Sequence, residues 1–181
     1  AGLKLPVDSV AASPSPPRDA ALRSQPTADS RYLFVSFEEE IRRARERAIS
    51  LTLLTLSLQN SPDDGAEEPG SGKDRLLRSV AHAVRGQMRG CDTCIRYAAN
   101  EFILILPGVT RDEARRVEGR LRIALQGISH EVRSGVSFKP RASLGSATFP
   151  EDGGSFDQLL TLADSRRLQD STAALPGMPP P

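Results

Sequence analysis

The chain has 181 residues, about one domain in length, and its 38% hydrophobic and 26% charged content is ordinary for a globular protein. Lysine plus arginine (24) nearly balances aspartate plus glutamate (23), so no bulk charge favours nucleic acid or an anionic membrane. No apolar run approaches the roughly 18 residues of a membrane span, and the first residues lack a signal-peptide pattern. We therefore expect a cytoplasmic protein with no membrane span in this chain and no nucleic-acid partner.

The two ends differ in composition from the middle. Residues 1–28 are crowded with Pro, Ser and Ala, residues 173–181 end in three prolines, and neither end has a periodic apolar pattern to bury. We interpret 1–28 as a linker, 29–172 as the folded domain and 173–181 as a tail. Because the chain begins with Ala1 and not Met, we expect it to be the output end of a longer signalling protein with an N-terminal sensory module.

The first half of the domain predicts helix, strand and helix in that order. Apolar residues at helical spacing indicate a helix over about 31–48, and the short run of Leu and Thr at 51–58 favours a strand. A second apolar stripe predicts another helix, with Gly90 as its stop. The stripe consists of Leu76, Val80, Val84 and Met88.

The second half begins with a predicted hairpin, in which runs 94–97 and 102–106 flank a tight turn. A helix around 114–125 follows, then strands over 132–138 and 142–149. Apolar residues from Phe156 to Ala163 mark a last helix. Helices that alternate with strands predict an α/β fold in which helices flank a central mixed sheet.

The turn of the predicted hairpin carries the most informative motif, Arg96-Tyr97-Ala98-Ala99-Asn100-Glu101-Phe102. It resembles the signature of the GGDEF domain of bacterial diguanylate cyclases, which reads Arg-Tyr/Leu-Gly-Gly-Asp/Glu-Glu-Phe. Five further segments resemble the same family in the same order. They are residues 31–44, 53–58, 118–122 and 143–153, and the pair Ala163-Asp164; Leu106-Pro107-Gly108 also closes the hairpin as in the family.

The resemblance implies the nucleotidyl-cyclase-like α/β fold of the family, in which two GTP-loaded domains meet and form cyclic di-GMP with divalent metals. The family's two metal-binding carboxylates fall on Ser57 and Asn100, and its two glycines fall on Ala98 and Ala99. Magnesium prefers carboxylate oxygens, and glycine lets a backbone turn approach phosphate closely. We therefore expect a degenerate catalytic site, no catalytic residues and no cofactor, with Mg²⁺ required only if activity persists.

Other family positions have also changed. The lysine that approaches the terminal phosphate in the last helix falls on Ser171. In the segment after the first strand, only Asp74 matches a guanine-contacting residue of the family. The retained Glu101 alone does not make a metal site.

One ligand site of the family matches completely. Many members bind cyclic di-GMP at an inhibitory Arg-x-x-Asp site five residues before the signature, where this chain has Arg89-Gly90-Cys91-Asp92. The third residue of that site, an arginine in the following helix, falls on Arg120. An arginine can bond guanine in a bidentate manner, and Asp92 can accept from guanine N–H groups. The alternative is an ordinary surface ion pair at a helix end.

Two weaker signals have simpler interpretations. Cys91 and Cys94 form a C-x-x-C pair, but Cys91 follows a helix C-terminus, which does not activate a thiolate, and the usual paired-histidine spacing for zinc is missing. His82 and His130 lie in unrelated elements. We interpret the cysteines as a coincidental pair of reduced thiols and the histidines as structural or exposed residues.

Three hypotheses follow. The first is a catalytically inactive GGDEF domain that serves as a cyclic di-GMP receptor or docking module, with a homodimer or a partner protein as its protein contact. The second is a weakly active diguanylate cyclase. The third is a structural or dimerising module that binds no nucleotide.

Overall fold

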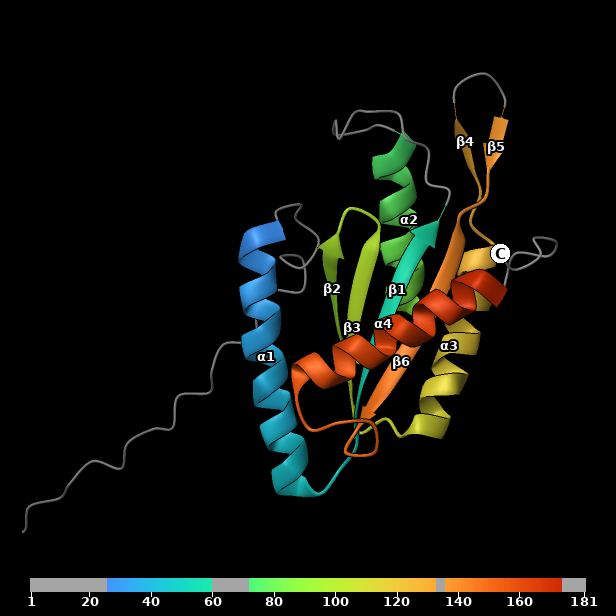
Figure 1. Cartoon of the computed structure of the whole chain (residues 1–181). Helices are drawn as coiled ribbons and strands as arrows, with labels where there is room; N and C mark the ends of the chain where they lie inside the picture. The colour runs from blue at the N-terminus through green and yellow to red at the C-terminus, as the bar shows by residue number, and fades with distance from the viewer. Residues whose placement is uncertain (1–25, 60–71, 133–135, 174–181) are drawn as a thin grey trace, which may run out of the picture.

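The structure is a computed structural model that describes residues 26–59, 72–132 and 136–173. Its elements are α1 (Pro26–Arg47), β1 (Leu51–Gln59), α2 (Gly72–Gly86), β2 (Thr93–Ala98), β3 (Glu101–Pro107), α3 (Arg111–Gln126), β4 (His130–Val132), β5 (Val136–Phe138), β6 (Arg141–Phe149) and α4 (Phe156–Ala173). Figure 1 shows a central sheet with helices on both faces and the β4–β5 hairpin projecting from one end. None of the described helices has both the length and the apolar composition to cross a membrane.

The central sheet has the strand order β2-β3-β1-β6, and every neighbouring pair in it is antiparallel. Each helical crossover passes over one strand: β3 lies between β1 and β2, and β1 lies between β3 and β6. Parallel strands are therefore never neighbours, as in other split βαβ arrangements. The predicted α/β class is confirmed, although the expected mixed sheet has only antiparallel pairings in the described part of the chain.

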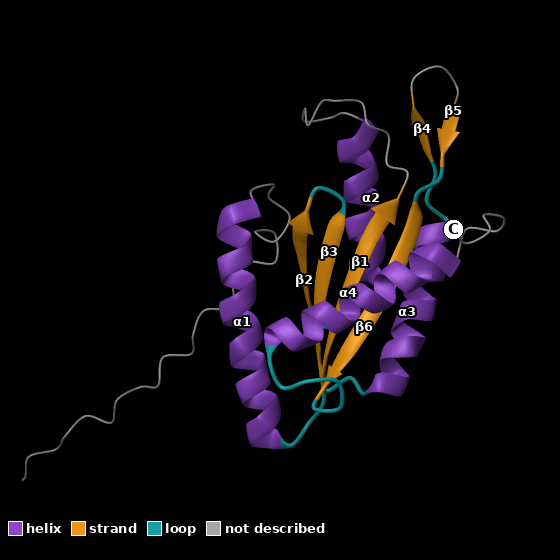
Figure 2. Cartoon of the chain, viewed as in Figure 1, coloured by secondary structure: helices purple, strands orange, loops and turns teal. Residues whose placement is uncertain are grey.

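The helices form one layer on each face of the sheet, as Figure 2 shows. The core on one face joins α2 and α3 to the sheet, and the core on the other face joins α1 and α4 to it. Leu54 and Leu56 point into the first core, and Leu51 and Leu53 point into the second. Because β1 is buried on both faces, its sequence lacks the alternation of apolar and polar residues that is typical of a half-buried strand.

α4 packs directly on β6 at Gly145. A Cβ added there would lie 2.2 Å from the carbonyl oxygen of Ala163 and 2.3 Å from the backbone nitrogen of Arg167. Real side chains do not fit at such distances, so only glycine permits this approach. Gly145 therefore fixes how closely α4 covers the sheet.

Two helix ends show how local sequence sets the chain path. At the end of α1, Ile49 N–H donates to Ala44 O (3.0 Å) and Ala48 N–H to Arg45 O (3.4 Å), while Ala48 has a positive φ of 52°. This is a Schellman motif with alanine where glycine is usual. At the start of α3, Thr110 and Glu113 form a capping box.

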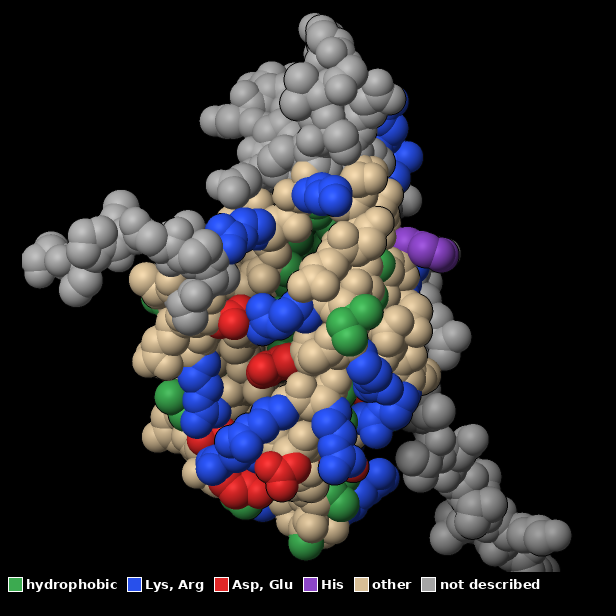
Figure 3. All heavy atoms as spheres, turned by 90° about the vertical axis from the view of Figure 1, so that its right-hand side faces the viewer, with side chains coloured by type: hydrophobic (Ala, Val, Ile, Leu, Met, Phe, Trp, Pro, Cys, Tyr) green, Lys and Arg blue, Asp and Glu red, His purple; other side chains and the backbone are tan. Residues whose placement is uncertain are grey.

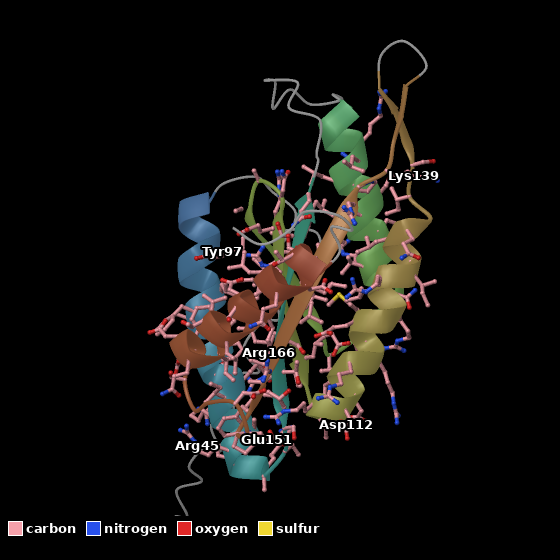
Figure 4. The ribbon with its side chains drawn as sticks, turned by 45° about the vertical axis from the view of Figure 1, so that its right-hand side comes forward. Arg45, Tyr97, Asp112, Lys139, Glu151 and Arg166 are labelled. Atoms are coloured by element: carbon pink, nitrogen blue, oxygen red, sulfur yellow. The ribbon has the colours of Figure 1, made fainter. Side chains whose placement is uncertain are left out.

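The free edge of β6 is satisfied by side chains. Asp170 accepts from Leu144 N–H (3.0 Å) and Asp152 from Thr148 N–H (2.9 Å), while Arg166 donates to Ser146 O (2.7 Å). Figure 4 labels Arg166, which extends from α4. These three side chains replace the hydrogen bonds that a further strand would make.

Some predicted boundaries were wrong. The predicted strand 132–138 is two strands, β4 and β5, which pair with each other as a separate hairpin. The second helix ends at Gly86 and not at Gly90. α1 begins at Pro26, inside the segment assigned to the linker; the rest of that segment and residues 174–181 lie outside the described residues.

Candidate functional site

The signature turn and the end of β1 lie together at one end of the sheet. Ser57 is opposite Glu101 in the β1–β3 register, and Leu58 N–H donates to Asn100 O (2.9 Å). The antiparallel pairing therefore brings Ser57, Asn100 and Glu101, three positions of the predicted degenerate site, side by side. In the chain, α2 and β2 separate the first of them from the other two.

The turn itself consists of Ala99 and Asn100, between β2 and β3. Tight two-residue turns usually need positive φ, which alanine disfavours. Ala48 is the only non-glycine residue with positive φ in the described ranges, so neither Ala98 nor Ala99 adopts it. The register of β2 against β3 instead shifts between Arg96 and Ala98, and Arg96 Nη2 donates to Ala99 O (2.7 Å). An irregularity in β2 thus accompanies a turn built without glycine.

The polar side chains of the turn are directed into the protein. Asn100 Oδ1 is buried and has no hydrogen-bond partner within the described part of the chain. Glu101 Oε1 lies 3.5 Å from Arg167 Nη2, and Arg167 Nε also donates to Asp164 Oδ1 (3.1 Å). The cavity beside Glu101 and Arg167 measures only about 10 Å³, roughly enough for one water. The cavity beside Glu101 and Arg167 is therefore too small to hold a nucleotide.

Ser171 also lies at this end of the sheet. Gln59 Nε2, at the end of β1, donates to Ser171 Oγ on α4. At the preceding residue of α4, Asp170 forms a bidentate pair with Arg122 of α3 (3.0 and 3.1 Å). The C-terminal half of α4 is thus attached to β1, α3 and β6. Asp74 lies in α2, but its side chain is outside the described part of the structure.

Arg89 and Asp92 form a tight pair in the loop between α2 and β2. Asp92 accepts from the Arg89 backbone N–H (2.7 Å) and from its Nε (3.3 Å) and Nη2 (2.9 Å). Arg89 Nη2 also donates to Pro107 O (2.8 Å), so the pair lies at the far end of β3 from the turn. The side-chain hydrogen bonds that Arg89 donates to Asp92 raise the pKa of Arg89, despite the opposing effect of burial.

The two side chains of this pair differ in exposure. The Asp92 side chain is 5% exposed, whereas that of Arg89 is 52% exposed. Asp92 therefore orients Arg89 and has little surface of its own to offer a ligand. Arg120 is exposed on α3 and makes no ion pair with any described residue. The structure thus brings Arg89 and Asp92 into contact. Arg120 has no ion-pair partner among the described residues.

Sequence reasoning missed Arg167 and Gln59. Their pairing with Glu101 and Ser171 depends on how α4 lies across the sheet, which no local pattern specifies. The one sequence signal for Arg167 is its i, i+3 spacing from Asp164, and that spacing does not point to Glu101.

The cysteines and histidines form no reactive or metal-binding group among the described residues. Cys91 is exposed, while the thiol of Cys94 packs against the α2–α3 core. Burial raises the pKa of Cys94 to about 12, so it is an inert thiol at neutral pH. His82 is exposed on α2, and the side chain of His130 lies outside the description.

A large open groove of about 880 Å³ lies away from all these positions, along the β6–α4 loop and the first turns of α4. Glu151, labelled in Figure 4, and Asp157 line it. The end of α1 reaches the same region, since Arg45 donates to Gly154 O (3.2 Å). None of the predicted site residues borders this groove.

Comparison with known proteins identifies relatives across most of the chain. Residues 28–172 match the family model "Diguanylate cyclase, GGDEF domain". Diguanylate cyclase DosC of Escherichia coli K12 is 25% identical over 134 residues, which are 74% of this chain and 29% of that protein. MucR of Pseudomonas aeruginosa, a bifunctional diguanylate cyclase/cyclic di-GMP phosphodiesterase, is 33% identical over 96 residues, covering 51% of this chain and 13% of its own. The chain thus spans less than a third of the length of these relatives.

Solved structures show the same fold. The isolated GGDEF domain of TpbB (YfiN) from Pseudomonas aeruginosa has a TM-score of 0.70 at 21% identity, covering 80% of this chain and 84% of that one. The active GGEEF domain of a Vibrio cholerae diguanylate cyclase has a TM-score of 0.69 at 14% identity, with coverages of 80% and 90%. Family model, relatives and fold agree, and the chain therefore belongs to the GGDEF family.

Proposed function

We propose that this GGDEF domain does not synthesise cyclic di-GMP and instead binds it as a receptor through Arg89, which Asp92 orients, and Arg120. The observation that carries the proposal is the contrast between the two ends of β3. At the turn, the polar groups are paired within the protein or buried. At the other end, a half-exposed guanidinium is held in a fixed orientation by Asp92 and Pro107 O.

The donors at the turn do not fit a divalent metal. Mg²⁺ needs hard oxygen ligands, chiefly carboxylates, and binds neutral hydroxyls and amides poorly. Ser57 offers a hydroxyl, the amide oxygen of Asn100 is buried, and Glu101 lies beside the positive charge of Arg167. A single carboxylate that already has a cationic neighbour is a weak metal ligand, so these residues do not fit Mg²⁺.

The same end is unsuited to phosphate. Ala98 and Ala99 place methyl groups where the family has glycine, and Ser171, at the position of the family's lysine, is hydrogen-bonded to Gln59. A loss of about 5 kcal/mol of transition-state stabilisation would slow the reaction on the order of 10³- to 10⁴-fold. Several independent losses of this kind support an inactive domain.

The receptor role rests on the donors that Arg89 retains. An arginine has five N–H donors, and the recorded bonds of Arg89 use those on Nε and Nη2. The two N–H groups on Nη1 make no recorded bond to a described residue. They and the exposed face of the guanidinium are available to a guanine edge, a base plane or a phosphate. Because Asp92 already orients the guanidinium of Arg89, ligand binding costs little conformational entropy of that side chain.

An activity assay tests the first half of the proposal. The full chain, incubated overnight at high concentration with GTP and Mg²⁺ or Mn²⁺, should give no cyclic di-GMP above a control without protein. A variant with Ala98→Gly, Ala99→Gly and Asn100→Asp should also remain inactive, because the changes at Ser57 and Ser171 are separate. Product from the wild type that Glu101→Ala abolishes would establish a weakly active cyclase instead.

A calorimetric titration with cyclic di-GMP tests the second half. Binding should be micromolar, because a few contacts of roughly 1 to 3 kcal/mol each must offset the cost of association. Arg89→Ala should weaken binding, while Arg115→Ala, which removes an arginine that is 72% exposed on α3, should change it little. A Kd of about 100 μM corresponds to a binding free energy of roughly −5.5 kcal/mol. If about 100 μM ligand gives no heat, the domain is better explained as a structural or dimerising module.

A further inference from the structure

The arginines on the two flanks of α3 differ in whether they form ion pairs. Helix periodicity places Ala114, Leu121 and Leu125 toward the core, and all three are buried. On one flank of this buried stripe, Arg111 pairs with Asp152 (2.7 Å) and Arg122 with Asp170 (3.0 Å), so this flank faces β6 and α4. The opposite flank therefore faces α2, with which α3 is in contact.

The flank facing α2 carries Glu113, Arg116 and Arg120. These residues are spaced at i, i+3 and i+7, so their side chains leave the helix within about 60° of one another. Arg116 and Arg120 are both exposed, and neither forms an ion pair within 4.0 Å with a described residue. Figure 3 views the side of the molecule on which α3 lies and shows several basic side chains there, with acidic side chains among some of them. The arginines that face α4 have acidic partners, whereas those that face α2 do not.

Glu113 connects this flank to Arg89. Arg89 donates to Pro107 O, shortly before α3 begins, while Glu113 Oε2 accepts from both Thr110 N–H and Thr110 Oγ (both 2.9 Å). Glu113 is thereby fixed at the first turn of α3. The hydrogen bonds from Thr110 lower the pKa of Glu113, and the charges of Arg89 and Arg116 lower it further. Arg116 follows Glu113 at i+3 on the same flank, and the charges of Arg89 and Arg116 both act on this carboxylate.

The charges of this region decide what it can bind. The loop 87–92 and this flank of α3 together carry Arg89, Asp92, Glu113, Arg116 and Arg120. Without Arg116, the two arginines and the two acids cancel. With Arg116 the surface is net positive, which an anionic ligand requires. Arg89 contributes little net charge because Asp92 neutralises it.

We propose that Arg116 binds a phosphate of the cyclic dinucleotide, beside Arg89 and one helical turn before Arg120. This inference rests on the proposed receptor function and adds a residue to its site. In this arrangement Arg89 recognises a guanine by directed hydrogen bonds, and Arg116 with Arg120 supplies the positive charge for the two phosphates. Within α3, the family pattern indicated only Arg120 as a ligand-binding residue. The position of Arg116 on the same flank of the helix adds it to the site.

The test compares two neighbouring arginines in the full chain. Arg116→Ala should weaken cyclic di-GMP binding about tenfold, as expected for loss of one charge-assisted contact, and Arg116→Glu should abolish it. Arg115→Ala should change the affinity less than about twofold, because Arg115 leaves the helix roughly 100° away from Arg116. Both arginines are exposed, so melting temperatures should match that of the wild type and a loss of binding will not reflect unfolding.

Salt dependence provides a second measurement. Binding by the wild type should weaken as salt is raised, because the phosphate contacts are screened, and Arg116→Ala should show a shallower dependence. Equal effects of Arg116→Ala and Arg115→Ala, in a protein whose wild type binds and whose Arg89→Ala variant binds less well, would overturn this inference alone. A wild type that does not bind would overturn the receptor function and this inference with it.

Discussion

The guanidinium of Arg167 lies 3.5 Å from the carboxylate of Glu101, the one acid in the signature turn. Arg167 comes from α4, is also bonded to Asp164, and is only 13% exposed. The positive charge of Arg167 therefore lies beside the carboxylate of Glu101. The same contact attaches the hairpin to α4, on the opposite face of the sheet from α2 and α3.

This pair should contribute measurable but small coupling. In a double-mutant cycle of Arg167→Met and Glu101→Gln, we expect about 0.5 kcal/mol of interaction free energy, because Glu101 is 37% exposed and solvent screens the pair. Urea unfolding of the four proteins measures it, and about 1 M salt should reduce it. A coupling that is indistinguishable from zero at low salt would show that the contact does not hold the turn.

Two glycines should respond in opposite directions to the same substitution. Gly145→Ala should destabilise the domain by at least about 3 kcal/mol, because the new methyl meets the backbone of α4. Gly119→Ala should stabilise it by about 0.5 to 1 kcal/mol, because Gly119 lies within α3 with open space around it. Denaturant midpoints of the two variants check both signs. A tolerated Gly145→Ala would mean that α4 can move away from β6 at little cost.

The end of α1 offers a stabilising substitution. Ala48 has a positive φ, which costs alanine about 1 kcal/mol relative to glycine, so Ala48→Gly should stabilise the domain by roughly 0.5 to 1 kcal/mol. Ala124→Gly, in the last turn of α3, is the matched control and should destabilise by about 0.5 to 1 kcal/mol. Thermal unfolding of both variants is sufficient. A loss of stability in Ala48→Gly would contradict the assigned cap.

Stability should fall in acid through Asp152. Burial alone would raise the pKa of Asp152, but hydrogen bonds from Arg166 and Thr148 N–H and the charges of Arg166 and Arg111 outweigh it, so the pKa is lowered on folding. Such a group stabilises the fold above its unfolded pKa of about 3.9 and loses that contribution as pH falls through the lower folded value.

The variant Asp152→Asn isolates this effect. It should be less stable at neutral pH by about 1.5 to 3 kcal/mol, since it loses charge-assisted hydrogen bonds, and its stability should depend less on pH below about 4. Unfolding free energies from neutral pH to acid compare the two proteins. Parallel pH profiles would assign the acid sensitivity to other carboxyl groups.

The two thiols should react very differently. Cys91 is exposed, whereas burial raises the pKa of Cys94 to about 12. At about pH 8, iodoacetamide should label Cys91 in the folded protein and reach Cys94 only after unfolding, because the thiolate is the reactive form. Mass spectrometry of peptides from native and denatured samples locates the label. Rapid native labelling of Cys94 would show that β2 opens readily.

The sequence predicted the elements that local patterns specify. β1 and β3 are short apolar runs flanked by turn-forming residues, so the sequence predicted both strands. Their observed antiparallel register then places Ser57 opposite Glu101. The contact between Arg167 and Glu101 could not be predicted in this way, because it depends on how close α4 comes to the sheet at Gly145. The β4–β5 hairpin was read as one strand, since a short β-rich run does not reveal where the chain reverses.

The side chains along β6 also bear on assembly. An unpaired edge strand is a template on which another chain can add, leading to aggregation or domain exchange. At β6 an incoming strand would first have to displace Asp170, Arg166 and Asp152 from the backbone groups of residues 144, 146 and 148. Those three side chains are themselves held by Arg122 and Arg111 or by one another. Two copies of this domain should therefore associate through faces or loops, and not by joining their sheets at β6.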